Sequence, residues 1–582
     1  MKHWLDGSGL LTCCGKVAQK IQESARESRL LRRWERTFSS AIAEGCNCPG
    51  VARFLQGQMA KSALLSWVYH YWGNLCASPC KALLLLLVPL LLLPALWMGI
   101  SFRWSAALVL VVAAALAVLL LWRSTSLIGF FGSAKLLAKW PIPQGVAALS
   151  VKVYLGVCGL LGGMVALFFG ATYGLLGGVV LAVLPALFRL PPLWAVCLLC
   201  GALPLLPTAA CAVLSVGIIV LYFFARAFGG EQGKPVDKID LLFALFPLLC
   251  IGSAIFSFDQ ADSFKVLGMW MSLYLCIFVV RRVVRSRGRL IAALSSLAIG
   301  ASASGLIGVL QFLSGQVDTT WTDVELFQSL DLRVYSTFEN PNVYGEFLLL
   351  VLPLVAGLAI YCQGRWRRLL WVAEGLLLLN LVLTYSRGCY VGLLLTAVAF
   401  LWRIHKRWTI ASLALGVPIA LLVLPQSVLD RIASIGNMND GSTAFRIYIY
   451  IGVAAMLAHY WLGGIGIGEG AFAKVYPKYA IPSVSAPHSH SLIFQTVISF
   501  GVAGLVYLYA VLASFQKAIA KAQAKASGKE RYLLIGFGAV LWGFLLQSVF
   551  DYTWYNYRVF QLFWIVLALG FSAAETTKGE TK

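Results

Sequence analysis

Apolar runs long enough to cross a membrane recur along almost the whole chain after Lys81, and short polar segments separate them. A run of about 18 or more apolar residues predicts a helix that spans the bilayer. Two runs are long enough to be either single helices or hairpins. The pattern predicts roughly 14 spans, or about 16 with two hairpins. They cover residues 82–98, 105–122, 152–189, 192–225, 240–257, 265–280, 290–314, 344–361, 368–384, 388–402, 408–424, 491–515, 532–550 and 557–574.

The composition agrees with an all-α polytopic membrane protein. Of the 582 residues, 60% are hydrophobic and only 12% are charged, whereas a soluble domain has roughly 25% charged residues. The net charge of +22 does not indicate a nucleic-acid partner, because the positive residues lie in short segments between apolar runs. That distribution is typical of loops on the cytoplasmic side of a membrane, so membrane lipids are the expected surroundings.

Four basic segments determine the predicted orientation. Loops rich in Lys and Arg stay in the cytoplasm, and between residues 240 and 574 such loops alternate with poorly charged or acidic ones. Both termini are then cytoplasmic. The outer segments include 315–342, 425–490 and 551–557, and they hold most polar residues that could do chemistry. The basic segments are Arg281 to Arg289, Arg365 to Arg368, Arg403 to Arg407 and Lys517 to Arg531.

The chain divides into four parts. Residues 1–81 are a predicted cytoplasmic extension, in which the stretch from about residue 16 to 43 has the apolar periodicity of an amphipathic helix on a membrane surface. Residues 82–239 hold the first spans. Residues 240–574 form a second membrane domain whose large outer loop, 425–490, is expected to contain helices. Residues 575–582 are a cytoplasmic tail.

No metal or cofactor site is predicted. The extension contains several cysteines, but their spacing is poor for zinc. His488 and His490 are two residues apart, and no third ligand is evident near them. The four cysteines in question are Cys46, Cys48, Cys76 and Cys80.

Arg446 is the first candidate for chemistry. The residues Gly441-Ser442-Thr443 predict a helix cap, and the helix after them runs to about Trp461. The ordinary interpretation of Arg446 is a solvated side chain at a helix start. However, a cation there opposes the helix dipole unless an anion lies near, so we expect Arg446 to have an anionic partner.

Arg387 is the second candidate. It lies in Thr384-Tyr385-Ser386-Arg387-Gly388, between two spans with almost no loop. Such an arginine can simply extend to the lipid headgroups. The positive-inside rule disfavours arginine on the outer side, however, and the forked guanidinium group suits phosphate.

His490 is the candidate general base. A histidine at a helix start is often a cap or a surface residue, but at the water–lipid boundary it can also accept protons near neutral pH. A rigid span comes directly after His490, whereas His488 comes after Pro487 in a loop with more freedom. We therefore assign the base to His490 and an auxiliary role to His488. Arg333 and Asp551 are further auxiliary candidates.

Two other patterns have structural interpretations. Gly463 to Gly468 resembles a phosphate-cradling loop, but no strand precedes it and no Lys-Ser/Thr comes after it. These glycines are expected to form a tight turn after the helix. The stretch Asn340-Pro341-Asn342 predicts a turn that starts the next span.

These pieces, in this order, resemble the O-antigen ligase and polymerase family of bacterial glycan-assembly glycosyltransferases. The resemblance covers about residues 240–574. The family usually has Asn after the histidine. This chain has Ser491 at that position but keeps the histidine itself. The matching motifs are Ser336 to Asn342, the Ser386-Arg387-Gly388 turn, the Arg446 helix, the glycine-rich turn, and His490 to Gln495.

The resemblance implies a membrane fold of the GT-C type in the bacterial cytoplasmic membrane, with the active site on the extracytoplasmic face. The donor would be a glycan on an undecaprenyl-diphosphate-type carrier, and the acceptor a hydroxyl of a glycan, lipid or protein. No metal or cofactor is implied. Arg387 and Arg446 would hold the diphosphate, and His490 would take the proton of the acceptor. A chain-length regulator or a flippase would be a possible partner.

Two other classes of function stay open. A lipid-linked oligosaccharide flippase or another transporter usually carries ionisable residues near mid-membrane and has paired halves. Here the acidic residues inside the spans are near the ends or isolated, as Glu346 and Glu374 are, and no internal repeat is evident. A scaffold protein would tolerate alanine at the outer arginines and at His490.

Overall fold

The computed structural model describes residues 87–89, 91–92, 155–164, 178, 191–227, 235–315, 333–436, 441–482 and 484–579. Within these residues the chain is helical and contains no strand. It divides into two units: residues 1–189 with 224–238, and residues 190–223 with 239–582. Most of the first unit, including the predicted extension and the cysteines considered for zinc, lies outside the described residues. The second unit contains almost all of the described helices.

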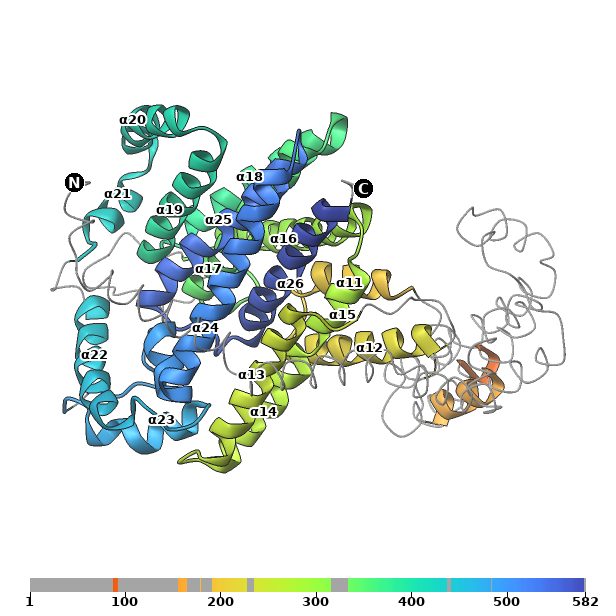
Figure 1. Cartoon of the computed structure of the whole chain (residues 1–582), viewed down its shortest axis with the longest axis horizontal. Coiled ribbons are helices and arrows are strands. Elements are labelled where there is room, and N and C mark those ends of the chain that lie inside the picture. The colour runs from red at the N-terminus through yellow and green to blue at the C-terminus, as the bar shows by residue number, and fades with distance from the viewer. Residues whose placement is uncertain are drawn as a thin grey trace, which may run out of the picture. The chain divides into compact units, whose positions relative to one another are not determined.

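The second unit is a bundle of long helices with a group of shorter ones at one end (Figure 1). The helices of the first part are α11 (Pro192–Ala202), α12 (Thr208–Ala227, which runs on into the first unit), α13 (Lys238–Ile255), α14 (Gln260–Tyr274), α15 (Cys276–Val283) and α16 (Arg287–Ser314). Next come α17 (Pro341–Tyr361), α18 (Gly364–Leu383), α19 (Arg387–Ile404) and α20 (Lys406–Val423). The last part contains α21 (Gln426–Ala433), α22 (Gly441–Tyr460), α23 (Glu469–Val475), η2 (Tyr476–Lys478), α24 (Leu492–Lys525), α25 (Glu530–Phe550) and α26 (Tyr557–Gly579).

Eight segments within the described residues are long and apolar enough to cross a membrane: α13, α14 with α15, α16, α17, α19, α24, α25 and α26. The all-α membrane architecture is therefore confirmed, whereas the predicted number of about 14 spans is not. The predicted spans 368–384 and 408–424 are helices here, α18 and α20, but neither belongs to these eight. The predicted run 192–225 is broken between α11 and α12. The spans 82–98 and 105–122 fall mostly outside the described residues.

The centre of the bundle is formed by α17 and α26. Of the apolar window of α17, 94% is buried, and of that of α26, 89%, against 28% for α13. Helices that are apolar all round suit a fully enclosed position. Packing of α17 against α25 and α18 encloses it, and aromatic side chains such as Trp564 fill the space beside α26.

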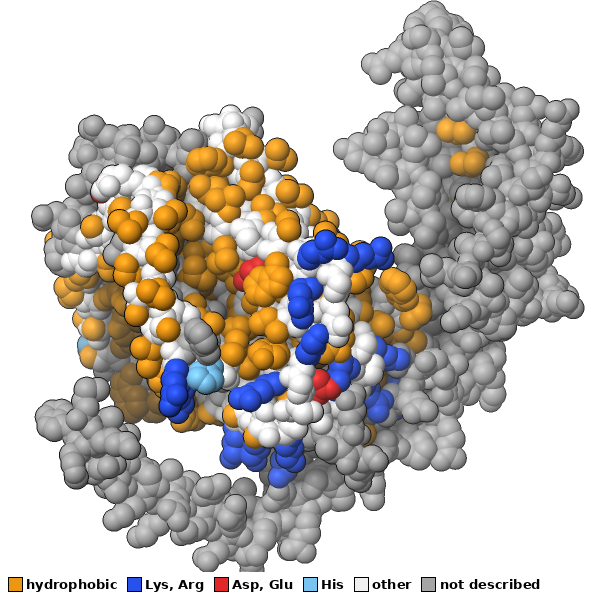
Figure 2. All heavy atoms as spheres, turned by 90° about the horizontal axis from the view of Figure 1, so that it is seen from above, with side chains coloured by type: hydrophobic (Ala, Val, Ile, Leu, Met, Phe, Trp, Pro, Cys, Tyr) orange, Lys and Arg blue, Asp and Glu red, His pale blue; other side chains and the backbone are white. Residues whose placement is uncertain are grey.

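The predicted basic segments meet at one end of this bundle. The guanidinium group of Arg287 pairs with Glu530 at the start of α25. Arg531 donates to the carbonyl oxygen of Arg403 over 3.3 Å, and Arg403 lies 3.4 Å from Gln516. Figure 2 shows Lys and Arg side chains gathered on this face. Three of the four basic segments thus share one end, as the predicted orientation requires, although the side of the membrane stays a prediction.

The predicted outer loop, 425–490, has a hydrophobic core of its own, as expected for a loop with helices. Ile449, Val453 and Met456 of α22 pack against Phe472 and Tyr476 from the α23 and η2 segment. The glycine-rich stretch forms the predicted turn, with φ of 74° at Gly464, 114° at Gly466 and 101° at Gly468.

That turn is fastened to a break in α24. Gly501 has φ of 66°, which interrupts the helix. At the break, the N–H of Ile465 donates to the carbonyl oxygen of Ile498 and the N–H of Val502 to that of Trp461, both over 2.7 Å. These bonds fix the loop to the first turns of α24, directly after the two histidines.

Candidate active site

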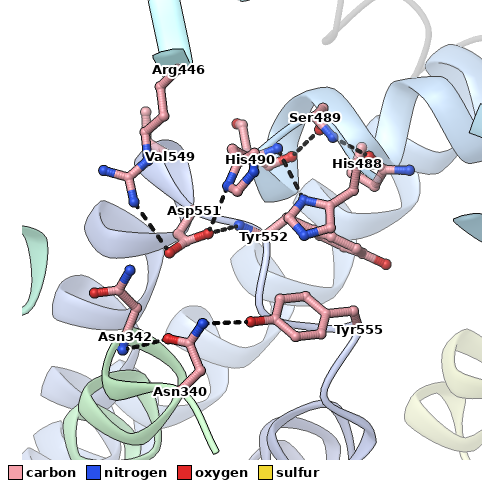
Figure 3. Close-up of polar contacts among 12 residues, drawn as sticks. Asn340, Asn342, Arg446, His488, Ser489, His490, Val549, Asp551, Tyr552 and Tyr555 are labelled. Atoms are coloured by element: carbon pink, nitrogen blue, oxygen red, sulfur yellow. Dashed lines mark hydrogen bonds and ion pairs between the residues drawn. The ribbon is translucent and has the colours of Figure 1, made fainter. Parts of the chain in front are cut away.

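Asp551, Arg446 and His490 converge from three elements (Figure 3). Asp551 comes directly after the last residue of α25, and its carboxylate is buried. Its Oδ2 lies 3.6 Å from a terminal nitrogen of Arg446, and its Oδ1 lies 3.5 Å from Nδ1 of His490. The anion that the helix-dipole argument requires near Arg446 is therefore present. A carboxylate beside Nδ1 favours the tautomer that leaves Nε2 free to accept a proton.

The backbone holds this cluster in place. Leu492, the first residue of α24, donates its N–H to the carbonyl oxygen of Asp551 over 3.2 Å. Tyr450 of α22 donates its hydroxyl to the carbonyl oxygen of His490 over 2.9 Å. His490 itself has φ of 49°, a left-handed conformation that non-glycine residues rarely adopt and that often marks a functional constraint. Three helices thus determine where His490 lies.

Two further effects bear on Asp551 itself. Its Oδ1 accepts the N–H of Tyr552 over 2.9 Å. Burial raises the pKa of Asp551, but the nearby imidazole of His490 and the charge of Arg446 outweigh burial and lower the pKa well below its ordinary value. The carboxylate is therefore ionised near neutral pH.

His488 is held more firmly than the sequence led us to expect. Its side chain is buried, stacks on Tyr555 with ring centroids 5.1 Å apart, and accepts the N–H of His490 at Nδ1 over 3.3 Å. The sequence predicted a loop with more freedom here than at His490. His488 does lie in a loop, but two tyrosines after Asp551 enclose its side chain. Burial, with a smaller effect of His490, lowers the pKa of His488 to about 3, so it is neutral near pH 7.

Arg333 lies close to the cluster. Its Nε donates to the carbonyl oxygen of Thr384 over 3.0 Å, and a terminal nitrogen lies 3.1 Å from Oδ1 of Asn342. Burial, and then the charges of Arg431 and Arg446, lower the pKa of Arg333 to about 9. Three arginines therefore act on one another electrostatically here, which favours an anion between them.

Arg387 belongs to a neighbouring group. It is the first residue of α19, one residue before the predicted start of that span at 388, and donates to the carbonyl oxygen and the hydroxyl of Ser434, each over 3.2 Å. Arg431 of α21 donates to the carbonyl oxygen of Tyr385 over 3.3 Å. Arg387 thus contacts Ser434, the residue directly after the helix that carries Arg431, whereas Arg446 contacts Asp551.

Arg431 is a residue that the sequence reasoning missed. Its helix, α21, has only eight residues, and no motif marks it. The strongly amphipathic pattern of that short segment was the available signal, because one face of a loop helix must pack on the bundle.

The turn Ser336 to Asn342 places the side chain of Asn342 beside Arg333. Asn340 caps α17 by accepting the N–H of Asn342 at its side-chain oxygen over 2.8 Å, and Pro341 is the first helical residue. The predicted role of this turn as a helix start is confirmed. Asn340 also donates to the hydroxyl of Tyr555 over 3.2 Å, the tyrosine on which His488 stacks.

Beside His488 lies a cavity of about 140 Å³. Its wall includes Tyr552, Trp554 and Gln495 as well as the carboxylates of Asp262 and Glu469. Among the residues that the structure describes, no group of three or more His, Cys, Asp or Glu side chains is arranged to hold a metal ion.

Residues 372–509 match a family model described as O-Antigen ligase. The family resemblance seen in the sequence is confirmed. The matched part runs from within α18 to within α24, so it includes Arg387, Arg446 and both histidines, whereas Asp551 and Arg333 lie outside it. A comparison with curated proteins finds no match. The match supports glycan transfer of the O-antigen ligase type in general terms.

Proposed function

We propose that this protein transfers a glycan from an undecaprenyl-diphosphate-type carrier to an acceptor hydroxyl at the extracytoplasmic face of the membrane. The observation that carries the proposal is the placement of one carboxylate, Asp551, between His490 and Arg446. A base held in a fixed tautomer beside a cationic group is what a displacement at a sugar carbon with a diphosphate leaving group needs.

In the proposed reaction, Nε2 of His490 takes the proton of the acceptor hydroxyl. The acceptor oxygen then forms a bond to the anomeric carbon of the donor glycan. The bond from that carbon to the diphosphate oxygen breaks, and the electron pair leaves with the lipid diphosphate. Asp551 stabilises the imidazolium form of His490 that results, as a carboxylate does in other histidine-dependent sites.

The arginines are assigned to the diphosphate. Arg446 is partly exposed, with a side-chain exposure of 26%, so its fork can reach a ligand while one nitrogen faces Asp551. Arg387 approaches from the α19 side, and Arg333 and Arg431 add positive charge between them. In this proposal the guanidinium groups neutralise the leaving group, a role that metal ions play at many other diphosphate sites.

The position of the cluster supports the predicted side. Asp551 comes after α25, whose other end, Glu530, pairs with the basic Arg287. The 21 residues of α25 span about 32 Å at 1.5 Å per residue, close to the roughly 30 Å of a bilayer core. With the basic end on the cytoplasmic side, as the charge pattern predicts, Asp551 and His490 would lie at the outer surface.

The decisive experiment compares the two histidines in purified protein with a synthetic prenyl-diphosphate-linked glycan. His490→Ala should lower turnover about 10²–10⁴-fold and leave the dissociation constant of the donor unchanged, because the arginines still bind the diphosphate. His488→Ala should keep a measurable fraction of activity.

The opposite pattern would exchange the roles of the two histidines. Full activity of both variants would remove this mechanism. Movement of the lipid-linked glycan across vesicles with no transfer by the unmodified protein would instead establish the transporter alternative.

A further inference from the structure

The cavity beside His488 lies next to the proposed base, His490. His488 lines it and, through its Nδ1, accepts the N–H of His490. The side chain of Gln495 also lines it, with its Oε1 accepting the N–H of Ser489 over 2.9 Å. One lining residue of the cavity, His488, is therefore in direct contact with His490, the residue that takes the proton in the proposed reaction.

The lining has the chemistry of a carbohydrate site. Tyr552, Trp554 and Tyr557 present aromatic surface, on which the C–H faces of a sugar ring pack. Carboxylates and an amide, next to these rings, can bond hydroxyl groups in both directions.

The charge of this cavity is opposite to that of the arginine group. Asp262 accepts the N–H of Gly470 over 2.9 Å, which fixes its carboxylate beside Glu469. Burial and the charge of Asp262 raise the pKa of Glu469. Within the described part of the chain, no Lys or Arg side chain lines the cavity, whereas Arg446 and Arg333 belong to the arginine group around Asp551. An anionic ligand is thus disfavoured in this cavity and favoured beside the arginine group.

We propose that this cavity binds one sugar ring of the acceptor, and that the ring is uncharged or carries an amino group. The inference rests on the proposed function and names the acceptor class that the function leaves open. A volume of about 140 Å³ is far above the roughly 10–15 Å³ that one water needs, yet below the roughly 300–1,000 Å³ of sites for larger ligands. It suits a single ring next to the base.

The test uses the full-length protein in lipid nanodiscs and methyl glycosides that differ only in charge: methyl glucoside, methyl glucosaminide and methyl glucuronide, with the same three in the galacto series. Dissociation constants come from saturation-transfer NMR. The unmodified protein should bind the neutral and amino glycosides at least about tenfold more tightly than the acid, the factor expected for an unfavourable like-charge contact of about 1.4 kcal/mol.

The double variant Asp262→Asn with Glu469→Gln should bring that ratio to within about twofold, because both repelling charges are gone. The matched control is Glu530→Gln, an acid-to-amide change at the Arg287 pair outside the cavity, which should leave the ratio unchanged.

Failure of this proposal and failure of the proposed function are distinguishable. Binding of the acid as tight as that of the neutral glycosides, no binding of any glycoside, or an unchanged ratio in the double variant would overturn the acceptor pocket, even with transfer intact. In transfer assays the neutral glycoside should compete with the acceptor and not with the donor; competition with the donor would overturn the assignment. If the protein prefers the neutral and amino glycosides but transfers no glycan, the proposed function is overturned and the sugar-binding cavity is not.

Discussion

Two buried carboxylates of the second unit, Asp240 and Asp551, lie beside basic side chains but in different ways. Asp240, in α13, bonds Arg281, and its second oxygen lies 3.1 Å from Arg282. Arg281 is only 1% exposed and also reaches Glu575 over 2.6 Å. Asp551 lies 3.5 Å from the imidazole of His490 and 3.6 Å from the guanidinium group of Arg446, and these side chains are 22% and 26% exposed.

The difference separates a structural ion cluster from a reactive one. Around Asp240 the carboxylate and Arg281 are buried and bonded directly to each other, so their charges neutralise one another. Around Asp551 the contacts are longer than good hydrogen bonds, and Arg446 and His490 keep solvent-facing atoms. Buried charges that are not fully satisfied within the protein are typical of functional sites.

The largest expected effect is on transfer. Arg446→Ala should lower transfer about 10²–10³-fold, the usual cost of removing one donor that stabilises a leaving group. Its effect on the thermal unfolding midpoint should be small, because the lost pair is loose and partly exposed. Arg446→Lys should recover only part of the rate, since a point charge cannot make a forked contact. Full transfer by the lysine variant would show that charge alone suffices.

Arg281→Ala provides the other half of the comparison. It leaves Asp240 buried without its closest partner, which should destabilise the protein by about 3–5 kcal/mol. Thermal and denaturant unfolding in nanodiscs measure this, with Arg365→Ala, an exposed arginine at the start of α18, as the control. The comparison fails if Arg281→Ala unfolds like the control, or if Arg446→Ala is the less stable of the two variants.

The extent of sequence prediction depends on how local each feature is. Helices such as α17 and α25 were predicted within a few residues, because their apolar runs are as long as the helices. The predicted span 491–515 ended too early, since α24 continues to Lys525 beyond the apolar run. Hydropathy marks the part of a helix that prefers lipid and not its last hydrogen bond.

The candidate site also has features that the local sequence predicts and features that only the packing of distant segments creates. The need for an anion near Arg446 was local reasoning from the helix dipole. That the anion is Asp551, which also faces His490, is a contact between residues far apart in the chain, and no sequence pattern shows it. Arg431 was missed for the same reason, because its proximity to Arg333 comes from the packing of α21 onto the bundle.

A pH dependence of stability should come from His488. Its pKa is about 3 in the folded state and roughly 6.5 when unfolded, so between these values the unfolded chain binds more protons. Stability therefore falls as the pH drops below 6.5, by about 2 kcal/mol between pH 7 and 5. Asp551 stays ionised in this range and does not contribute.

The control for that measurement is His488→Phe, which keeps an aromatic ring against Tyr555 but cannot titrate. The unfolding midpoint of the unmodified protein should drop more between pH 7 and 5 than that of the variant. Equal drops in both proteins would mean that other groups determine the acid sensitivity.

The smallest expected effect concerns the one departure from the family motif, Ser491. Its hydroxyl caps α24 by accepting the N–H of Phe494 over 3.5 Å, and Asn is an equally good cap. Ser491→Asn should therefore change neither stability nor transfer, while Ser491→Ala should cost about 1 kcal/mol. Because the cap fixes the start of α24 directly after His490, transfer by the alanine variant should fall by less than about tenfold, well below the loss expected for the base itself. An asparagine variant as impaired as the alanine variant would show that Ser491 contributes something other than a cap.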